Sequence, residues 1–307
     1  MKIGFAGSGA MGSGFGYLLH KGGHDVTFMD FWDEHIRAIN ENGLSIDFNG
    51  YRDTVRIPAQ RPENVSESFD AVFVFTKAMD LDRMLTAIDH TLTDETAVVC
   101  LLNGLGHRSR IARYVPEGNI VMGTTVWSAS LEAPGCTSFR GEGPVEVQET
   151  APSGKPAAEK IVRIMKDCGL NGVYSEDVKF TTWRKACVNG TMNSLSALLD
   201  AKIAELFASK HTMRVIRRIV EEFAEAARLD GVTLDADEIT DYLVNVSETV
   251  GAHYPSMHQD ITKLRPTEIE YLNGYVARLL EGHGKQAPVS RTITELVHGK
   301  EETLGIL

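Results

Sequence analysis

The sequence of 307 residues contains few cysteines, no excess of positive charge and no long apolar run. Its four cysteines lie far apart without a C-x-x-C pair, so we expect small core residues in a reducing compartment and neither disulfides nor a metal site. A formal net charge of −11, without a Lys/Arg cluster, argues against nucleic acid or an anionic membrane as a partner. The longest apolar stretches, such as residues 97–102, are far shorter than the roughly 20 residues of a membrane-spanning helix.

The beginning of the chain also lacks the features of a secretory leader. A single lysine is followed directly by a strand and glycines, with neither an apolar h-region nor a cleavage site, so we expect a cytoplasmic protein. The remaining composition, 43% hydrophobic and 24% charged, is that of an ordinary soluble globular protein. At roughly 150 residues per domain, the length indicates two domains.

The first half of the chain alternates between strand and helix patterns. Strands are expected at 2–6, 25–29, 71–76 and 97–102, and helices over 11–21, 33–42, 80–91 and 155–168. The last two of these strands are continuous apolar runs, which is typical of a parallel sheet covered by helices on both faces. Residues 120–149 contain strand patterns punctuated by Gly and Pro, and we predict them to be antiparallel additions at the sheet edge.

The second half of the chain has a helical pattern almost throughout. Helices are expected over 178–199, 210–229, 235–250, 266–282 and 288–303. The predicted fold class is therefore α/β, with a Rossmann-type doubly wound parallel sheet over residues 1–176 and an all-helical C-terminal domain over residues 177–307. The helical domain must bury several amphipathic faces, so we expect part of its surface to form a homodimer.

A glycine motif, Gly7-Ser8-Gly9-Ala10-Met11-Gly12, joins the first strand to the first helix. Its pattern is that of a dinucleotide-binding loop, and the required context is present: a strand before it, a helix after it and an acidic residue, Asp30, at the end of the second strand. Gly7 would make the tight turn, Gly9 would let the backbone approach a pyrophosphate, and Gly12 would allow close helix–strand packing. A glycine-rich turn without a ligand is the alternative.

Asp30 bears on the choice of cofactor. A carboxylate at this position accepts hydrogen bonds from the adenosine ribose 2′-OH and repels a 2′-phosphate, whereas sites for NADP usually have an arginine there or one residue later. The next residue is Phe31, and the nearest arginine along the chain is Arg37. We therefore predict NAD(H) as the preferred cofactor and NADP(H) as the second candidate. Capping of the next helix by Asp30 or Asp33 is the alternative role.

Polar residues also follow the two apolar strands of the sheet. Thr76 and Lys77 end one strand, and Asn103 ends the next. Ligands bind at the carboxyl ends of the strands in an open parallel sheet, so we expect these residues near the nicotinamide ribose and a polar substrate. Each of them could also be an ordinary loop residue.

The helix predicted over 178–199 carries one polar stripe. Lys185, Asn189 and Asn193 follow one another at intervals of four, so they share a face that drifts by roughly 40° per step. The other positions are mostly apolar or small, and a buried helix with such a stripe is costly unless the stripe faces a polar cavity. A solvated face is the alternative, but two asparagines of poor helix propensity argue against it. We therefore favour a binding site.

Two segments nearer the C-terminus supply further candidates. Ser256 lies in the segment 254–261, and Glu268 lies in the first turn of the helix predicted after Pro266. A glutamate in a first turn can serve catalysis, or it can complement the helix dipole or cap the helix. The spacing alone leaves both roles open.

The chain resembles the ketopantoate reductase family over essentially its whole length. The resemblance rests on GSGAMG at 7–12, TKA at 76–78, LNGLGH at 102–107, WRKACVNGTMN at 183–193, PSMHQDI at 255–261 and TEIEYLNG at 267–274. The last three segments are specific to the family, whereas the first is shared by many dehydrogenases. The resemblance implies a Rossmann domain joined to a helical domain, with the substrate bound in the cleft between them.

The family's motifs imply roles for the matching residues. By this resemblance, Lys185 is the general acid and Glu268 is catalytic beside it. Hydride would reach the keto carbon of a 2-oxo acid while Lys185 stabilises the charge on the carbonyl oxygen and delivers the proton. The residues implied to hold the substrate are Asn103, Asn189, Asn193 and Ser256, and Lys77 is implied to lie near the nicotinamide.

The chain departs from the family pattern at three positions. Phe31 stands where the mostly NADPH-dependent family has an arginine, and Ile203 and His253 align with two asparagines that reach the substrate in pantoate-forming members. Relatives with NADH preference and relaxed pockets act as D-2-hydroxyacid dehydrogenases on branched or aromatic 2-oxo acids. We predict such a reductase, which would convert the 2-oxo acid to the D-2-hydroxy acid. The alternative is a 2-dehydropantoate 2-reductase (ketopantoate to pantoate), and a non-catalytic dinucleotide sensor is a remote one.

Overall fold

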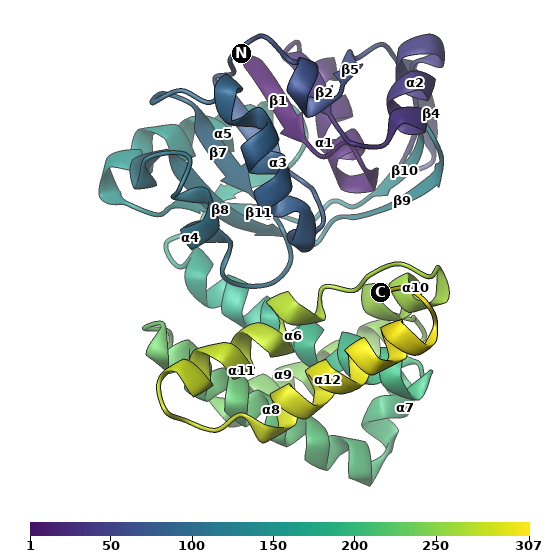
Figure 1. Cartoon of the computed structure of the whole chain (residues 1–307), viewed down its shortest axis with the longest axis vertical. Helices are drawn as coiled ribbons and strands as arrows, with labels where there is room; N and C mark the ends of the chain where they lie inside the picture. Colours follow the sequence, from purple (N-terminus) through teal and green to yellow (C-terminus); the bar gives the residue numbers. More distant parts are fainter. The chain divides into compact units, whose positions relative to one another are not determined.

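The computed structural model describes residues 1–307, and the chain divides into two compact units (Figure 1). The first unit contains Met1–Leu102 and His107–Val178. The second unit contains Asn103–Gly106 and Lys179–Leu307. The short segment Asn103–Gly106 thus belongs with the second unit, although it closely follows a strand of the first.

An eight-stranded sheet forms the centre of the first unit, in the order β12-β11-β8-β7-β6-β1-β2-β5. Its strands are β1 (Lys2–Ala6), β2 (Asp25–Met29), β5 (Ala59–Gln60), β6 (Ala71–Val74), β7 (Ala97–Cys100), β8 (Ile120–Thr125), β11 (Val145–Glu149) and β12 (Gly172–Tyr174). Neighbouring strands from β8 to β5 are parallel, and the order of strands reverses between β1 and β6. This is the predicted doubly wound arrangement, and its switch point lies between β1 and β6.

Helices cover both faces of this sheet. They are α1 (Ala10–Lys21), α2 (Asp33–Asn42), α3 (Leu81–Ile88), α4 (His107–Ile111) and α5 (Lys155–Asp167). Phe5 and Phe73 pack into the same apolar cluster as residues of α1 and α5, whereas Val72 and Val98 pack into the cluster that contains α3 and α4. Alternate residues of each strand are therefore buried on opposite faces, which explains the continuous apolar runs.

The prediction for residues 120–149 is correct only in part. β8 is a parallel strand inside the main sheet, and β11 is antiparallel to it. The two strands between them form a separate four-stranded sheet with two earlier strands, in the order β4-β3-β10-β9. These strands are β3 (Leu44–Phe48), β4 (Tyr51–Val55), β9 (Ser128–Ala133) and β10 (Cys136–Arg140). β10 pairs in parallel with β3, a distant partner that no local pattern indicates.

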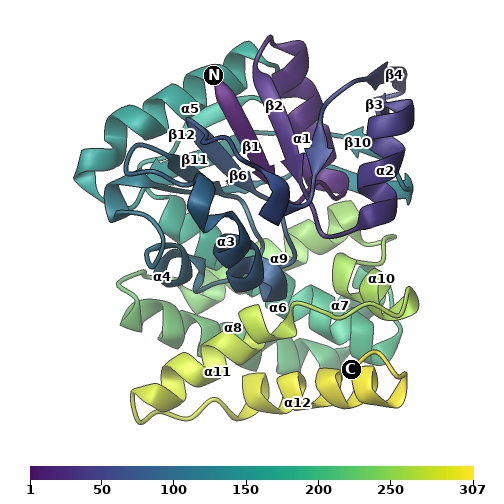
Figure 2. The ribbon, with the colours of Figure 1, turned by 45° about the horizontal axis from the view of Figure 1, so that its top comes forward.

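The second unit is all-helical. Its helices are α6 (Val178–Leu199), α7 (Ile203–Ala208), α8 (Lys210–Leu229), α9 (Ala236–Val250), α10 (Ser256–Thr262), α11 (Asn273–Gly282) and α12 (Pro288–Thr303). α11 packs against both α8 and α12 around an apolar core, and it runs beside α12 in Figure 2. α7 and α10 have no counterpart among the predicted helices. None of the helices combines the length and apolar composition that a membrane crossing requires.

The helix expected over 266–282 begins later than predicted. A 3₁₀ turn covers Ile269–Tyr271, Leu272 has φ −116° and ψ −102°, and α11 starts only at Asn273. Glu268 therefore precedes a 3₁₀ turn and is not in the first turn of an α-helix. The helix-dipole role left open for it is wrong for that reason, and its side chain makes no capping hydrogen bond to that turn.

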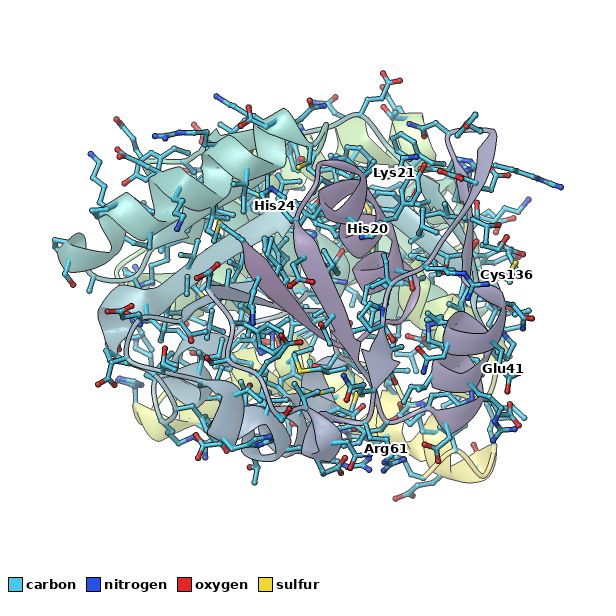
Figure 3. All side chains as sticks on the ribbon, turned by 90° about the horizontal axis from the view of Figure 1, so that it is seen from above. His20, Lys21, His24, Glu41, Arg61 and Cys136 are labelled. Atoms are coloured by element: carbon cyan, nitrogen blue, oxygen red, sulfur yellow. The ribbon has the colours of Figure 1, made fainter.

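All four cysteines are free. Cys100, Cys168 and Cys187 are buried, whereas Cys136 on β10 is partly exposed (Figure 3). Burial raises the pKa of Cys100 and of Cys187 to about 12, so both remain neutral thiols at ordinary pH. No group of three His, Cys, Asp or Glu side chains is placed to hold a metal ion.

Candidate active site

The glycine motif forms the tight turn between β1 and α1. Gly7 has φ +100°, and a Cβ atom there would lie 2.7 Å from the backbone of Phe75 and Thr76. A Cβ atom at Gly12 would lie 2.0 Å from the Gly7 carbonyl oxygen, whereas one at Gly9 would meet nothing within 4 Å. Packing therefore requires glycine at Gly7 and Gly12, while the backbone at Gly9 is open to the approach of another group.

The N-terminus of α1 and the end of β6 border this turn. α1 begins at Ala10 with no side-chain cap and no acidic residue in its first turn, so its dipole presents a positive end to an anion. Thr76 lies against Gly7, and its buried hydroxyl oxygen has no hydrogen-bond partner. Lys77, the next residue, is partly buried. An open glycine, an uncapped helix and an orphaned hydroxyl fit a bound dinucleotide phosphate.

Asp30 connects the end of β2 to the glycine turn. Its Oδ2 accepts hydrogen bonds from the Ser8 N–H (2.7 Å) and the Ser8 hydroxyl (2.9 Å). Its Oδ1 accepts one from the Trp32 N–H (3.0 Å). α2 starts at Asp33 without a side-chain cap, so neither Asp30 nor Asp33 caps it in the way proposed as the alternative. Asp30 instead fixes Ser8 and keeps its carboxylate next to the turn.

His35 holds the same turn from the other side. It is fully buried, its Nε2 lies 2.8 Å from the Ser8 carbonyl oxygen, and its Nδ1 accepts a hydrogen bond from the Gly135 N–H (3.0 Å). Because Nδ1 is the acceptor, Nε2 carries the proton and donates to Ser8. Burial lowers the pKa of His35, which keeps the ring neutral. The sequence contains no signal for this role, since the partners are distant in the chain.

Two arginines surround Phe31, although the nearest arginine along the chain is Arg37. The Arg83 guanidinium carbon lies 3.8 Å from the centre of the Phe31 ring. Arg61 donates to the Phe31 carbonyl oxygen (3.3 Å) and to Asp33 (2.8 Å) (Figure 3 labels Arg61). Arg61 is therefore neutralised by a carboxylate, whereas Arg83 makes no ion pair. Folding thus places the positive charge of Arg83 beside Phe31, although no arginine is close to Phe31 in the sequence.

In the second unit, the polar stripe of α6 lies on an otherwise largely buried helix. The residues from Gly190 to Ala197 are all buried, including Asn193, whereas Lys185 and Asn189 are partly exposed. The Asn193 amide donates to the Ser256 hydroxyl on α10 over 3.2 Å. The solvated-face alternative is wrong for Asn193, because this asparagine is engaged inside the unit.

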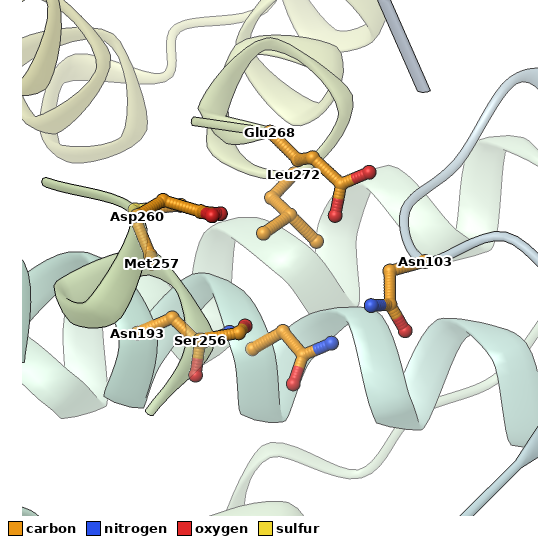
Figure 4. A pocket seen from close by; sticks show the side chains of 8 residues that line it. Asn103, Asn193, Ser256, Met257, Asp260, Glu268 and Leu272 are labelled. Carbon is orange, nitrogen blue, oxygen red and sulfur yellow. The ribbon is translucent and has the colours of Figure 1, made fainter. Parts of the chain in front are cut away.

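A pocket in the second unit brings most of the predicted residues together (Figure 4). Its lining residues are Asn103, Asn189, Asn193, Ser256, Met257, Asp260, Glu268 and Leu272. In Figure 4, Asn193 lies beside Ser256, and the Glu268 carboxylate points toward the side of the pocket where Asn103 lies. All four predicted substrate residues and Glu268 therefore share one pocket within one unit.

Asn103 reaches this pocket because its loop is attached to the segment that carries Glu268. The Leu105 N–H donates to the Tyr271 carbonyl oxygen over 2.8 Å. Gly104 has φ +94°, and a Cβ atom there would lie 2.7 Å from the same oxygen. Only glycine allows the two backbones to approach this closely.

Two opposing effects determine the pKa of Lys185. Burial lowers its pKa from 10.5 to about 8, and the negative charge of Glu268 opposes that effect by raising it. A lysine with a pKa near neutrality is a better proton donor than an ordinary lysine, because its pKa lies closer to the working pH.

Three pocket residues were not among the predicted ones. Met257 and Asp260 lie on α10, a helix that the sequence pattern did not predict, and Leu272 lies at the break before α11. Asp260 is only 9% exposed. The sequence pattern alone does not reveal that this aspartate is buried. The motif at 255–261 contained both α10 residues, but spacing gave them no role.

Known families match both units. The model described as Ketopantoate reductase PanE/ApbA matches residues 3–152, and the one described as Ketopantoate reductase PanE/ApbA C terminal matches residues 177–301. This chain belongs to the ketopantoate reductase family. Two of its curated relatives are named 2-dehydropantoate 2-reductase. The protein from Streptococcus pyogenes serotype M3 is 45% identical over 307 residues, or 100% of both chains, and that from Lactococcus lactis subsp. lactis is 43% identical over 99% of both.

Two solved structures with similar sequences have the same fold. The ternary structure of D-mandelate dehydrogenase with NADH and anilino(oxo)acetate is 41% identical, covers 99% of both chains and has a TM-score of 0.94. The complex of D-mandelate dehydrogenase with NADH is also 41% identical, covers 99% of this chain and 100% of its own, and has a TM-score of 0.93. The ketopantoate reductase family member described here is accordingly an NAD(P)-dependent oxidoreductase that acts on a CH–OH group or its ketone.

Proposed function

We propose that this protein reduces 2-dehydropantoate to pantoate, with Lys185 as the proton donor. The observation that carries the proposal is the pocket in which three asparagines and a serine lie with Glu268, near a lysine whose pKa is about 8. Hydrogen-bond donors suit the carboxylate and carbonyl of a 2-oxo acid, and the lysine suits its reduction. The curated relatives favour 2-dehydropantoate over the branched or aromatic acids that the sequence favoured.

In this mechanism Lys185 supplies the proton. When bound, the cofactor supplies the hydride that reduces the keto carbon. The carbonyl oxygen gains negative charge as the hydride arrives, and the Lys185 ammonium stabilises that charge and protonates the oxygen. With a pKa of about 8, Lys185 is mostly protonated at neutral pH and yet gives up its proton more readily than an ordinary lysine.

Glu268, Ser256 and the asparagines prepare the site for this step. The charge of Glu268 raises the pKa of Lys185, which keeps the ammonium form populated despite burial. The Ser256 oxygen accepts a hydrogen bond from Asn193, so its own O–H can donate to the substrate carboxylate. These contacts orient the keto carbon and replace the water that the substrate loses.

For the cofactor we propose NADH as the preferred form. The Asp30 carboxylate accepts from ribose hydroxyls and repels a 2′-phosphate, and Phe31 gives that phosphate no cation of its own. D-mandelate dehydrogenase, at 41% identity, has a structure with NADH. Arg83, which makes no ion pair beside Phe31, supplies a cation that reduces the preference, so NADPH remains a weaker alternative.

A second candidate is the reduction of a branched or aromatic 2-oxo acid to a D-2-hydroxy acid. Similarity to D-mandelate dehydrogenase favours it. Ile203 and His253, the positions that align with two substrate-binding asparagines of the family, are neighbours here, with the Ile203 N–H 3.4 Å from the His253 carbonyl oxygen. Neither residue lines the pocket described above, but the family resemblance implies that they face the far end of the substrate, where their side chains provide no amide.

A panel of 2-oxo acids with NADH and NADPH tests both candidates. The panel contains 2-dehydropantoate, 2-oxoisocaproate, 2-oxoisovalerate, phenylglyoxylate and pyruvate, and kcat/KM is measured for each. The highest value for 2-dehydropantoate supports the proposal, and a highest value for phenylglyoxylate, 2-oxoisocaproate or 2-oxoisovalerate assigns the second candidate instead. Turnover of none of these acids would overturn both.

A further inference from the structure

A histidine between two glutamates lies behind the segment that carries Glu268. His298 is on α12, and its Nδ1 lies 2.6 Å from Glu301 Oε2 while its Nε2 lies 3.0 Å from Glu270 Oε1. Glu301 is only 1% exposed, and its other oxygen accepts a hydrogen bond from the Thr267 N–H over 2.6 Å. Thr267 and Glu270, on either side of Glu268, therefore both form hydrogen bonds with side chains of α12. These contacts all lie within the second unit.

The protonation state of His298 decides whether the ring can donate a hydrogen bond to both Glu301 and Glu270. A neutral imidazole has one N–H, so one of its nitrogens would face a carboxylate oxygen as acceptor against acceptor. The imidazolium form donates to both carboxylates and adds charge attraction to each hydrogen bond. The charged groups around the ring are Glu301 on its own helix, Glu270 on the 3₁₀ turn and Arg278 on α11, which binds the second oxygen of Glu270.

The same segment also supports the substrate side of the pocket. Tyr271 follows Glu270 directly, and its carbonyl oxygen accepts the Leu105 N–H of the loop that places Asn103 (2.8 Å). Movement of the 267–271 segment would thus displace both Glu268 and Asn103. A misplacement of about 1 Å in a catalytic group can cost roughly a hundredfold in rate.

We propose that protonated His298 is a positioning residue for Glu268. Its Nε2 hydrogen bond holds Glu270 against α12, and its Nδ1 hydrogen bond fixes Glu301, which accepts the Thr267 N–H. Loss of the imidazolium proton leaves one of these two carboxylates without a donor from the ring. Turnover therefore falls as His298 is deprotonated, separately from the fall caused by Lys185. This inference rests on the catalytic role proposed for Glu268.

The test compares His298→Gln with His283→Gln. Glutamine can keep one hydrogen bond but cannot carry the charge, whereas His283 lies exposed at the end of α11 with its Nδ1 2.8 Å from the Leu279 carbonyl oxygen. We measure kcat, KM and their pH profiles for a 2-oxo acid, together with the Kd of NADH and an NMR titration of the His298 ring resonance. His298→Gln should lower kcat roughly tenfold to a hundredfold and remove the pH component that follows the His298 titration. The Kd of NADH should change by less than about twofold.

Two results would overturn the proposal: an unchanged kcat profile in His298→Gln, or a lower kcat with the pH component still present. If His298→Gln does not fold, Glu270→Gln replaces it, since the neutral amide removes the attraction to the imidazolium. That variant should shift the NMR resonances of the His298 ring, because the ring loses a charged partner, and unchanged resonances would contradict the pairing. If the wild-type protein reduces no 2-oxo acid, the proposed function fails, whereas these resonances still test the network.

Discussion

Glu268 and the burial of Lys185 act in opposite directions on the pKa of that lysine. Burial lowers the pKa, the Glu268 carboxylate raises it, and the balance lies at about 8. The ammonium group is thus present at neutral pH but close to its titration. Both residues belong to the second unit, which also contains the asparagine- and serine-lined pocket.

This balance predicts the pH dependence of turnover. Reduction needs the protonated lysine, so kcat should fall as pH rises through about 8, whereas oxidation of the hydroxy acid needs the free amine and should rise over the same range. Initial rates in both directions between about pH 6 and 10 measure the two limbs. Limbs that run in the same direction would contradict the assignment.

Glu268→Gln should move these limbs. The amide no longer raises the pKa of Lys185, so burial acts unopposed and the reductive limb shifts to lower pH. Glu281→Gln is the control, because Glu281 on α11 forms an ion pair with Arg291 on α12 at the surface of the unit. The limb should stay in place in that variant, and a shift of equal size in both variants would rule out a specific effect of Glu268.

The choice between NADH and NADPH should depend on Arg83. Removal of a cation that can reach a phosphate costs about tenfold in affinity, so Arg83→Ala should raise the Kd of NADPH by roughly that factor and change that of NADH by less than about twofold. Energy transfer from tryptophan to the bound nicotinamide measures both. Arg37→Ala on α2 is the matched control. Equal losses for both cofactors would assign Arg83 to the adenine or to the fold.

His35 should make stability depend on pH. Burial places its folded-state pKa below the free value of 6.5, so the unfolded chain takes up the proton first as pH falls. The stability that His35 contributes is therefore complete above about pH 6.5 and is lost as pH falls toward the folded-state pKa. His35→Gln keeps a donor and an acceptor but cannot titrate, so denaturant unfolding between about pH 5 and 7.5 should show a smaller loss of stability toward low pH than in the wild type. An unchanged dependence would contradict the role.

Local patterns were sufficient for much of the fold. The bounds of α6, α8 and α12 agree with the predicted helices, and the doubly wound sheet is confirmed, because apolar runs and amphipathic repeats are properties of neighbouring residues. The second sheet was missed, since β10 pairs with β3 across a long stretch of chain. α7 and α10 are too short for a periodic pattern to show.

The same distinction applies to the candidate site. The stripe of Lys185, Asn189 and Asn193 could be predicted because helical spacing fixes which residues share a face. Arg83 beside Phe31 and His35 beneath Ser8 could not, because only the folded chain brings them together. The homodimer stays a prediction, which sedimentation equilibrium can test.

The most direct test of the proposed function is a single-turnover measurement. Enzyme in excess is loaded with NADH and mixed with 2-dehydropantoate, and the loss of nicotinamide absorbance is followed for the wild type, for Lys185→Ala and for Lys179→Ala. Lys179 lies on the same helix and forms a surface ion pair with Asp230, so its loss should leave the rate unchanged. Lys185→Ala should bind NADH normally and lose roughly two to four orders of magnitude in rate. A near-normal rate in Lys185→Ala would contradict the account.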